Sequence, residues 1–313
     1  MKRLVIGILL LTVVIFVRGQ DTANNMARLF CYFKDNGEDG LHLAYSKDDL
    51  HWTALKHDSS FLAPTVGDEH LIRDPCIIQG PDGIFRLIYT VGWHDTGIGY
   101  AWSKDLIHWS EEKYIPMMKQ VKGARNCWAP EVFYDHASGE YMIYWATTIP
   151  GRFPETDTSG EDKYNHRIYY SLTKDFLAFT PAKLLYDPGF SVIDASIQQS
   201  AGRYIMFFKD ETLKPVAKKN IRISFSRHLT YGYGAPSAPI TGRYWAEGPT
   251  ALHRNTRWIV YFDQYTNDKM GAVVSSDLKH WTDISDKLTF PKGTRHGTIF
   301  QVSKRIFEQI VAR

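Results

Sequence analysis

The feature that most constrains this sequence is a set of short motifs that recur about 50 to 60 residues apart, most of them carrying an acid. In chain order they are Arg73-Asp74-Pro75, Ala129-Pro130-Glu131, Ile193-Asp194-Ala195, Glu247-Gly248-Pro249 and His296-Gly297-Thr298. A repeat of about this length is typical of folds in which one small β-sheet recurs around an axis. The first strand of every sheet then lies at that axis, so acids far apart in the sequence are expected to meet.

Two further elements repeat in step with these motifs. Runs of aromatic and β-branched residues, which favour buried strands, occur at 84–90, 141–146, 204–208 and 258–262. Segments with Ser or Thr followed by Asp occur at 46–52, 103–109, 173–177 and 275–281, and a weaker copy occurs at 226–229. Because Ser and Asp side chains bond nearby backbone in tight turns, we interpret these segments as scaffold. Each repeat therefore predicts three strands and a short fourth strand that closes the sheet.

The two ends of the chain complement each other. Residues 29–33 and 41–45 read as strands that lack a first strand, whereas residues 295–304 supply a first strand that lacks partners. If both ends share one sheet, the ring closes and two exposed strand edges disappear. We therefore predict an all-β fold: a five-bladed β-propeller whose last blade is closed by N- and C-terminal strands, forming one catalytic domain over residues 27–313.

The first residues have the pattern of a secretory signal. Lys2 and Arg3 precede an apolar run at 4–17, which is shorter than the roughly 20 residues that a membrane-spanning helix needs. We predict a signal peptide at 1–19 and a secreted or periplasmic protein, with an uncleaved membrane anchor as the alternative. Cleavage removes three of the cations from a chain of net charge +3 and leaves it near neutral. This charge indicates neither nucleic acid nor membrane as a partner, and we expect a monomer.

The three cysteines, Cys31, Cys76 and Cys127, are odd in number and have no metal-ligand spacing. This pattern supports no disulfide framework, so we interpret them as small buried apolar residues.

Nearly the whole chain after the predicted signal resembles glycoside hydrolase family 43. The resemblance rests on the order, one per blade, of Arg73-Asp74-Pro75, Trp128-Ala129-Pro130-Glu131, Val192-Ile193-Asp194 and Ala246-Glu247-Gly248-Pro249. It implies a five-bladed, inverting enzyme that acts on glycans containing arabinose or xylose. It also implies that Asp74 takes the place of the general base, Glu247 that of the general acid, and Asp194 that of the acid that modulates its pKa.

The chemistry independently needs such a set of acids. Inverting hydrolysis uses a protonated carboxyl and an ionised carboxylate about 6.5–9.5 Å apart, with a water between them. A third carboxylate nearby raises the pKa of the acid, and Asp194 is expected to do so for Glu247. The alternatives are that Asp74 caps a turn before its proline and that Glu247 serves only in an ion pair. Asp35 is a rival base, although Asn36 and Gly37 after it favour a turn.

Substrate binding is expected from the aromatic residues Trp128 and Trp93, and an aromatic content of 14% suits both stacking on sugars and packing between blades. Arg295 is expected to bind a sugar hydroxyl or to pair with an acid. Glu131 stands where most members of the resembling family carry Asp, and we expect it to bond neighbouring strands or a ligand hydroxyl. For His296 the resemblance implies a central-channel site for a cation, usually calcium, with a hydrogen-bonded core histidine as the alternative. The reaction itself requires no cofactor.

Several functions remain open at this point. An exo-acting α-L-arabinofuranosidase comes first, and a β-xylosidase or β-galactofuranosidase follows. The polar, Gly-rich stretch 150–165 could wall a pocket, which would favour exo cleavage. A non-catalytic glycan-binding propeller would tolerate loss of an acid, yet all three are present. A sucrose- or fructan-cleaving enzyme is expected to carry an Asn-Asp-Pro-Asn opening, which this sequence lacks. A glycoside phosphorylase needs a cluster of Arg, Lys and His that the motifs do not assemble.

Overall fold

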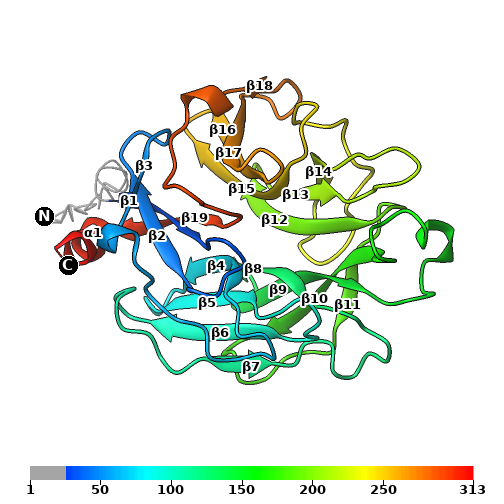
Figure 1. The fold of residues 1–313 in the computed structure, drawn as a ribbon, viewed down its shortest axis with the longest axis horizontal. Helices are drawn as coiled ribbons and strands as arrows, with labels where there is room; N and C mark the ends of the chain where they lie inside the picture. The colour runs from blue at the N-terminus through cyan, green and yellow to red at the C-terminus, as the bar shows by residue number, and fades with distance from the viewer. Residues whose placement is uncertain (1–25, 313) are drawn as a thin grey trace, which may run out of the picture.

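The computed structural model describes residues 26–312, which form five antiparallel β-sheets arranged around one axis (Figure 1). This arrangement confirms the predicted five-bladed β-propeller. The predicted signal peptide at 1–19 lies outside the described residues. Within residues 26–312, no helix has the length and apolar character needed to cross a membrane.

Four blades are built from consecutive strands, and each begins with the strand nearest the axis (Figure 1). The first blade contains β4 (Arg73–Gln79), β5 (Phe85–Thr90), β6 (Ile98–Ser103) and β7 (Lys113–Ile115). The second contains β8 (Trp128–Asp135), β9 (Glu140–Thr148), β10 (His166–Thr173) and β11 (Lys183–Tyr186). The third contains β12 (Val192–Ser200), β13 (Arg203–Asp210) and β14 (Asn220–Ser226), and the fourth contains β15 (Glu247–Arg254), β16 (Arg257–Gln264), β17 (Lys269–Ser275) and β18 (Thr282–Asp283).

The fifth blade joins the two ends of the chain, as predicted. Its strands are β19 (Thr298–Ser303), β1 (Met26–Tyr32), β2 (His42–Ser46) and β3 (Trp52–Ala54). The pairing of β19 with β1 is antiparallel and places Leu29 opposite Phe300. Helix α1 (Lys304–Val311) follows and buries Ile306 and Ile310 in the cluster that contains Leu29. Short 3-10 helices lie in the connections at η2 (Lys56–Asp58), η3 (Pro154–Thr156) and η4 (Ser285–Lys287).

The third blade departs from the predicted pattern, because it has three strands and no fourth. Residues 227–246, all of which the structure describes, contain no strand. This segment lies beside β14 and is joined to it by isolated backbone hydrogen bonds, such as Ser237 N to Ile223 O at 2.8 Å and Ile240 N to Ile221 O at 2.8 Å. Pro236 immediately precedes Ser237, and a proline has no N–H to donate to a sheet. The expectation of four strands in every blade is therefore wrong for this blade.

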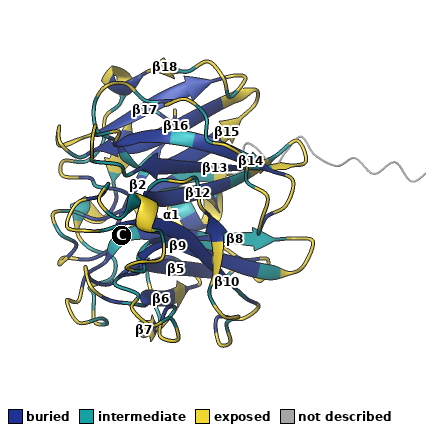
Figure 2. Ribbon diagram, turned by 90° about the vertical axis from the view of Figure 1, so that its right-hand side faces the viewer, coloured by how far each residue is buried: buried dark blue, intermediate teal, exposed yellow. Residues whose placement is uncertain are grey.

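The core lies between neighbouring blades, where strands are buried while the turns around them are exposed (Figure 2). Between the fourth and fifth blades, for example, Trp52 packs edge-on against Tyr261 with ring centroids 5.8 Å apart. Cys31, Cys76 and Cys127 are buried free thiols, as expected. Packing between sheets thus stabilises the ring without cross-links in its described part.

The repeated Ser-Asp segments form tight turns at the outer side of the blades. In the first blade, Ser103 Oγ accepts a bond from Leu106 N at 2.8 Å, and Asp105 Oδ1 accepts one from His108 N at 2.8 Å. The same pair of contacts recurs at 46–51 and 275–280. Leu106 has a φ of 64°, which the bonds on both sides of it hold in place. These contacts confirm that the segments are scaffold.

Candidate active site

The innermost strands of the first four blades share one irregularity. Each has a register shift within its motif, which spans Arg73 to Cys76, Trp128 to Glu131, Ile193 to Ser196 and Glu247 to Thr250. In each shift the second residue has a positive φ: 48° at Asp74, 47° at Ala129, 54° at Asp194 and 58° at Gly248. A bulge of this kind bends a strand and redirects its side chains. Positive φ at a residue other than glycine is uncommon and concentrates at functional sites.

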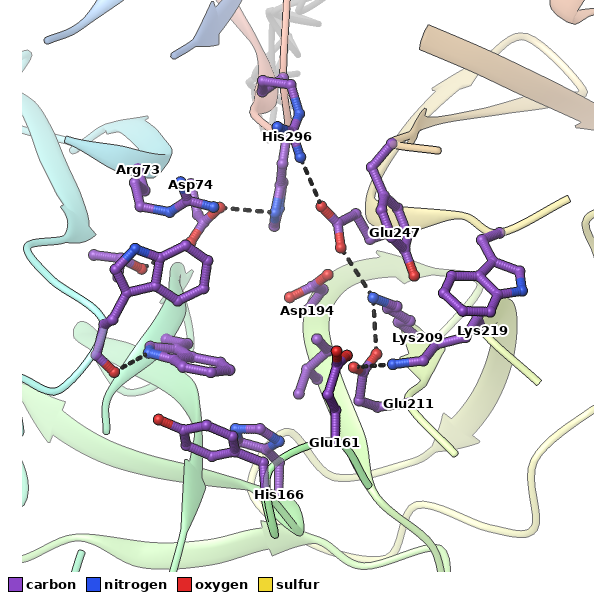
Figure 3. A pocket seen from close by; sticks show the side chains of 18 of the residues that line it. Arg73, Asp74, Glu161, His166, Asp194, Lys209, Glu211, Lys219, Glu247 and His296 are labelled. Atoms are coloured by element: carbon purple, nitrogen blue, oxygen red, sulfur yellow. Dashed lines mark hydrogen bonds and ion pairs between the residues drawn. The ribbon is translucent and has the colours of Figure 1, made fainter. Parts of the chain in front are cut away.

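These bulges decide which acids share a cavity. Asp74 and Asp194 occupy the positive-φ position of their bulges, and Glu247 comes one residue earlier in its own. All three side chains line one cavity of about 520 Å³, and Figure 3 shows them pointing toward one another from three blades. Glu131 comes two residues after the positive-φ position, and it does not line this cavity. The sequence spacing alone could not make this distinction.

Glycine at position 248 has a steric reason. A Cβ atom there would lie 2.3 Å from the ring of His296, and Gly248 also has a φ of 58°. Both conditions exclude larger residues, because a contact under 3.0 Å forces the neighbouring ring to move. The glycine therefore allows the fourth-blade bulge and the fifth-blade imidazole to approach each other.

Asp74 is held as a carboxylate by groups from two other segments. Its Oδ1 lies 3.2 Å from His296 Nδ1, and its Oδ2 accepts a bond from Thr90 Oγ1 at 2.9 Å. Burial opposes ionisation, but the charge and hydrogen bond of His296 outweigh it and lower the pKa of Asp74 to about 2. Burial likewise opposes a charged imidazole, yet Asp74 and then Asp194 raise the pKa of His296 to about 9. At neutral pH the two residues form an ion pair.

Asp194 has the opposite tendency. Its Oδ2 accepts a bond from Gly248 N at 3.0 Å, which joins the third blade to the fourth. Burial raises the pKa of Asp194 to about 7; the Glu247 carboxylate adds to this shift, and His296 opposes it. Asp194 therefore holds a proton more readily than Asp74, although both occupy the same position in their bulges.

Glu247 lies between two permanent cations. Its Oε2 accepts a bond from Lys209 Nζ at 2.9 Å, and its Oε1 lies 3.3 Å from Arg295. Burial opposes ionisation, but the charge of Lys209 and, to a smaller extent, that of Arg295 hold the pKa of Glu247 below its usual value. We expected Asp194 to raise the pKa of Glu247. In this structure the raised pKa belongs to Asp194, because the two cations favour the charged form of Glu247.

Aromatic side chains line one side of the cavity. Trp93 and Trp128 meet edge-on with centroids 5.6 Å apart, and Trp128 Nε1 donates to the carbonyl of Trp93 at 2.9 Å. Trp93 is 39% exposed, which places it at the rim. The structure thus brings both predicted stacking residues to the same cavity as the three acids.

Comparison with known proteins decides the family. Residues 24–308 match the sequence profile of a glycoside hydrolase 43-related family, described as a probable glycosyl hydrolase domain. The chain belongs to this family. Membership assigns residues 24–308 to a probable glycosyl hydrolase domain.

Solved structures share the fold of this chain at low identity. An α-L-arabinofuranosidase from Lactobacillus brevis is 20% identical with a TM-score of 0.54, over 68% of this chain and 72% of that chain. A thermostable family-43 glycoside hydrolase is 17% identical with a TM-score of 0.57, over 75% of this chain and 80% of that chain. A curated α-L-arabinofuranosidase from Bifidobacterium longum subsp. longum is 22% identical over 197 residues, which are 56% of this chain. The aligned part spans only 18% of that relative's length.

Other predicted site residues of this chain have structural partners. Arg295 lines the cavity, and its Nε donates to Asp263 Oδ2 at 2.6 Å. Of the two roles predicted for it, the structure shows the pairing with an acid. Glu131 lies among neighbouring strands, where its carboxylate accepts bonds from Tyr144 at 3.1 Å and Thr298 at 3.4 Å. Burial raises the pKa of Glu131 to about 7. The geometry therefore favours its bonds to strands over the predicted contact with a ligand hydroxyl.

Asp35 and the stretch 150–165 also have clear positions. Asp35 lies in a turn closed by Gly37 N and Lys34 O at 2.8 Å, and it does not line the cavity, so the structure does not support it as a rival base. The stretch 150–165 contributes Glu161, Asp162 and Tyr164 to the cavity lining. It therefore walls the pocket.

The residues around His296 do not fit the calcium ion that the resemblance implies. Across residues 26–312, no group of three or more His, Cys, Asp or Glu side chains is arranged to hold a metal ion. The ring of His296 faces Asp74, and a protonated imidazole has no lone pair to offer a cation. The calcium site therefore stays an implication of the resemblance that the side chains around His296 do not support.

Several charged or titratable residues that line the cavity were not predicted from the sequence, among them Lys209, Glu211, Lys219 and His166. One signal could have found Lys209. The innermost strand of a blade pairs with the second strand in the antiparallel sense, so the first residue of its motif lies opposite the end of that second strand. Ile193 thus lies opposite Lys209, and Glu247 lies opposite Asp263. A charged residue that ends an otherwise apolar second strand is therefore expected near the axis. Lys219 and His166 follow no such rule, because Lys219 lies in the loop before β14 and His166 is the first residue of β10, a third strand.

Proposed function

We propose that this hydrolase releases non-reducing-end α-L-arabinofuranosyl residues from plant-type polysaccharides or oligosaccharides, with inversion at the anomeric carbon. The observation that carries the proposal is the convergence of Asp74, Asp194 and Glu247 on one walled cavity, with opposite electrostatic surroundings. The stretch 150–165 along its wall suits a chain end better than the middle of a polymer. The arabinofuranosidases among its relatives support this sugar.

In the proposed reaction, Asp74 acts as the general base. Its low pKa keeps it ionised, so it can take a proton from a water molecule as the water oxygen attacks the anomeric carbon. His296 and Thr90 hold the carboxylate in place through both of its oxygens. Glu247 donates a proton to the leaving oxygen as the glycosidic bond breaks.

Asp194 and Glu247 supply that proton as a pair. Because the raised pKa of Asp194 is about 7, the pair holds one proton up to about neutral pH, and such a proton belongs to the pair and not to either residue. Lys209 and Arg295 stabilise the Glu247 carboxylate that remains after proton donation. The cations thus favour the product side of the proton transfer.

Hydrolysis suits this cavity better than phosphorolysis. Four permanent cations line the cavity, but three of them are paired with carboxylates: Lys209 with Glu247 and Glu211, Lys219 with Glu211, and Arg295 with Glu247 and Asp263. The fourth, Arg73, donates to Asn36 and stacks 4.3 Å from the ring of Trp93. No cluster of uncommitted cations is left among these residues for a phosphate.

A panel of nitrophenyl α-L-arabinofuranoside, β-D-xyloside and β-D-galactofuranoside tests the substrate, with the first anomer released followed by NMR. We expect the arabinofuranoside to be cleaved fastest and to release the inverted anomer. Faster cleavage of the xyloside or galactofuranoside would replace the proposed sugar, and a retained anomer would overturn the mechanism. Export of the chain, which rests on residues 1–19, is tested by the N-terminal sequence of the protein recovered outside the cytoplasm.

A further inference from the structure

Asp263 is a fully buried carboxylate that lies just outside the cavity. It stands near the end of β16, it is 0% exposed, and it lies opposite Glu247 in the pairing of β15 with β16. Its Oδ2 accepts two hydrogen bonds, whereas its Oδ1 has no hydrogen-bond partner among the described residues. The hydrogen bonds that tie Asp263 to its surroundings are therefore those of Oδ2.

The two donors to Oδ2 are consecutive residues of the fifth blade. Arg295 Nε donates at 2.6 Å, and the backbone N–H of His296 donates at 3.3 Å. Both lie in residues 291–297, which contain no strand. The backbone N–H of Arg295 also donates to Phe33 O at 3.0 Å. Asp263, from the fourth blade, thus fixes the end of a loop that leads into β19.

Arg295 and His296 reach opposite members of the proposed acid and base. Arg295 lies 3.3 Å from Glu247 Oε1, and His296 Nδ1 lies 3.2 Å from Asp74 Oδ1. One carboxylate oxygen is therefore a single residue removed from both catalytic carboxyl groups. Inverting hydrolysis depends on the separation of these two groups, which is about 6.5–9.5 Å. A displacement of about 1 Å can lower the rate of such a reaction about 10²-fold.

Stability alone does not account for this carboxylate. A buried ion pair adds little net stability, because the loss of water costs the two charges about as much as they gain from each other. The unbonded Oδ1 adds a further cost, since buried polar atoms are nearly always bonded. Burial and then the charge of Glu247 raise the pKa of Asp263 to about 6, so it is ionised at neutral pH. A buried charge kept at this cost indicates a role in the site.

We propose that Asp263 is a positioning residue that keeps the general acid and the general base at one spacing. Its Oδ2 holds the side chain of Arg295 against Glu247. The same oxygen holds the backbone of His296, whose imidazole then meets Asp74. The inference rests on the proposed function, because it takes these two carboxyl groups as acid and base.

Three variants separate the position of these groups from the charge of Asp263. Asp263→Asn keeps an oxygen acceptor, and its amide nitrogen takes the place of the unbonded Oδ1. Asp263→Leu keeps the volume and removes the acceptor, and Asp263→Ala replaces it if the Leu variant does not fold. Without the acceptor, we expect kcat to fall about 10²-fold with KM nearly unchanged. The loss should appear on both an aryl arabinofuranoside and an arabino-oligosaccharide, because acid and base both move, and the Asn variant should recover most of it.

A control at the same junction of blades measures the effect of stability by itself. Asp49 is buried away from the cavity, and it joins the fifth blade to the fourth by pairing with Arg28 at 2.8 Å and Arg254 at 2.8 Å. Asp49→Leu removes a carboxylate shared by two arginines. It should lower the free energy of unfolding in a denaturant titration and leave kcat and KM unchanged.

NMR of the full-length protein labelled with ¹⁵N-histidine reports the position of His296 without relying on turnover. Its Nδ1–H signal, assigned by its loss in His296→Gln, reports the bond to Asp74. We expect Asp263→Asn to retain this signal and Asp263→Leu to shift or lose it. The inference is overturned if the Leu variant keeps its kcat or this signal. It is also overturned if the Asn variant loses about 10²-fold in kcat, which decides the matter even where the other two variants do not fold.

Failure of this inference can be told apart from failure of the proposed function. If the arabinofuranoside is cleaved and Asp263→Leu keeps its kcat, the inference fails while the proposed function stands. If no arabinofuranoside is cleaved but the signal of His296 is lost in Asp263→Leu and retained in Asp263→Asn, the proposed substrate fails while the positioning by Asp263 stands.

Discussion

Residues with positive φ recur in two places, at the axis in the first four blades and at the outer turn of every blade but the third, and the two sets differ in how they are held. At the outer turns, Leu106 and Leu278 have φ values of 64° and 61°, and each is held by side chains within three residues in sequence. At the axis, Asp74 and Asp194 have φ values of 48° and 54°, and their carboxylates are held by other blades. The outer residues, whose positive φ is held by bonds from their own turn, belong to the scaffold. The axial residues, whose carboxylates are held by other blades, mark the site.

The largest test of this contrast is Asp74→Asn. Loss of the general base should lower kcat/KM by about 10³-fold, at the middle of the range for such catalysis, while the far-UV circular dichroism stays unchanged. The matched outer variant Asp105→Asn should keep normal kcat/KM. Normal turnover in Asp74→Asn would remove Asp74 from the mechanism.

Glu247→Gln should distinguish the acid from the base. An aryl arabinofuranoside with a good leaving group needs little help from a proton donor, but its water still needs activation. The variant should therefore lose about 10²-fold or more on an arabino-oligosaccharide and much less on the aryl substrate. Asp74→Asn should show no such recovery. If Asp74→Asn is the variant that recovers, the two assignments are reversed.

Gly248→Ala tests how closely the axis strands pack. The new Cβ would lie 2.3 Å from the His296 ring, so we expect the free energy of unfolding to fall by about 3 kcal/mol, with activity lost as His296 moves. The control is Gly202→Ala, where φ is 71° but nothing lies within 4 Å. It should lose only about 1 kcal/mol, the cost of positive φ alone. Equal losses in a denaturant titration would show that the close approach to His296 has no cost.

Lys209→Met tests the charge contact that crosses from the third blade to the fourth. Lys209 lowers the pKa of both Glu247 and Asp194, so its removal should raise the pKa of the pair. The basic limb of the pH profile of kcat/KM should move to higher pH, with a smaller loss of maximal rate than in Glu247→Gln. The exposed Lys174→Met serves as the control. A shift to lower pH, or none, would contradict the proton-sharing pair.

The smallest effect is expected at an outer turn. Burial opposes ionisation of Asp105, but its bonds to His108 lower the pKa from 3.8 to about 2. Its folded pKa is thus depressed, so its contribution is present above pH 4 and is lost as the pH falls toward 2. Asp105→Ala should reduce the free energy of unfolding by about 1 kcal/mol at pH 7, and the difference should shrink in that acid window. An equal difference at pH 7 and pH 2 would show that the ionised form contributes nothing.

The sequence predicted the parts of the site that are written into the repeat. Asp74, Asp194 and Glu247 stand in motifs at regular spacing, and Trp93 and Trp128 flank those motifs, so ring symmetry brings them to one cavity. Glu131 stands in an equivalent motif but does not reach the cavity. Glu131 differs from the three acids by its position, two residues after the positive-φ residue of its bulge. The motif alone does not show where the bulge falls, because the bulge depends on how the strand pairs with its neighbour.

By itself, the sequence determined the number of blades, the closure by both ends and the outer turns, because these follow from periodicity and from bonds within a few residues. Only the tertiary structure decided the three-stranded third blade, the cations beside Glu247 and the unbonded ring of His166. Each of these depends on packing between segments that lie far apart in the chain. The charge of Glu247 is set by Lys209 from another blade, and the ring of His166 lies against Tyr164 and Trp128 while its two nitrogens lack hydrogen-bond partners among the described residues.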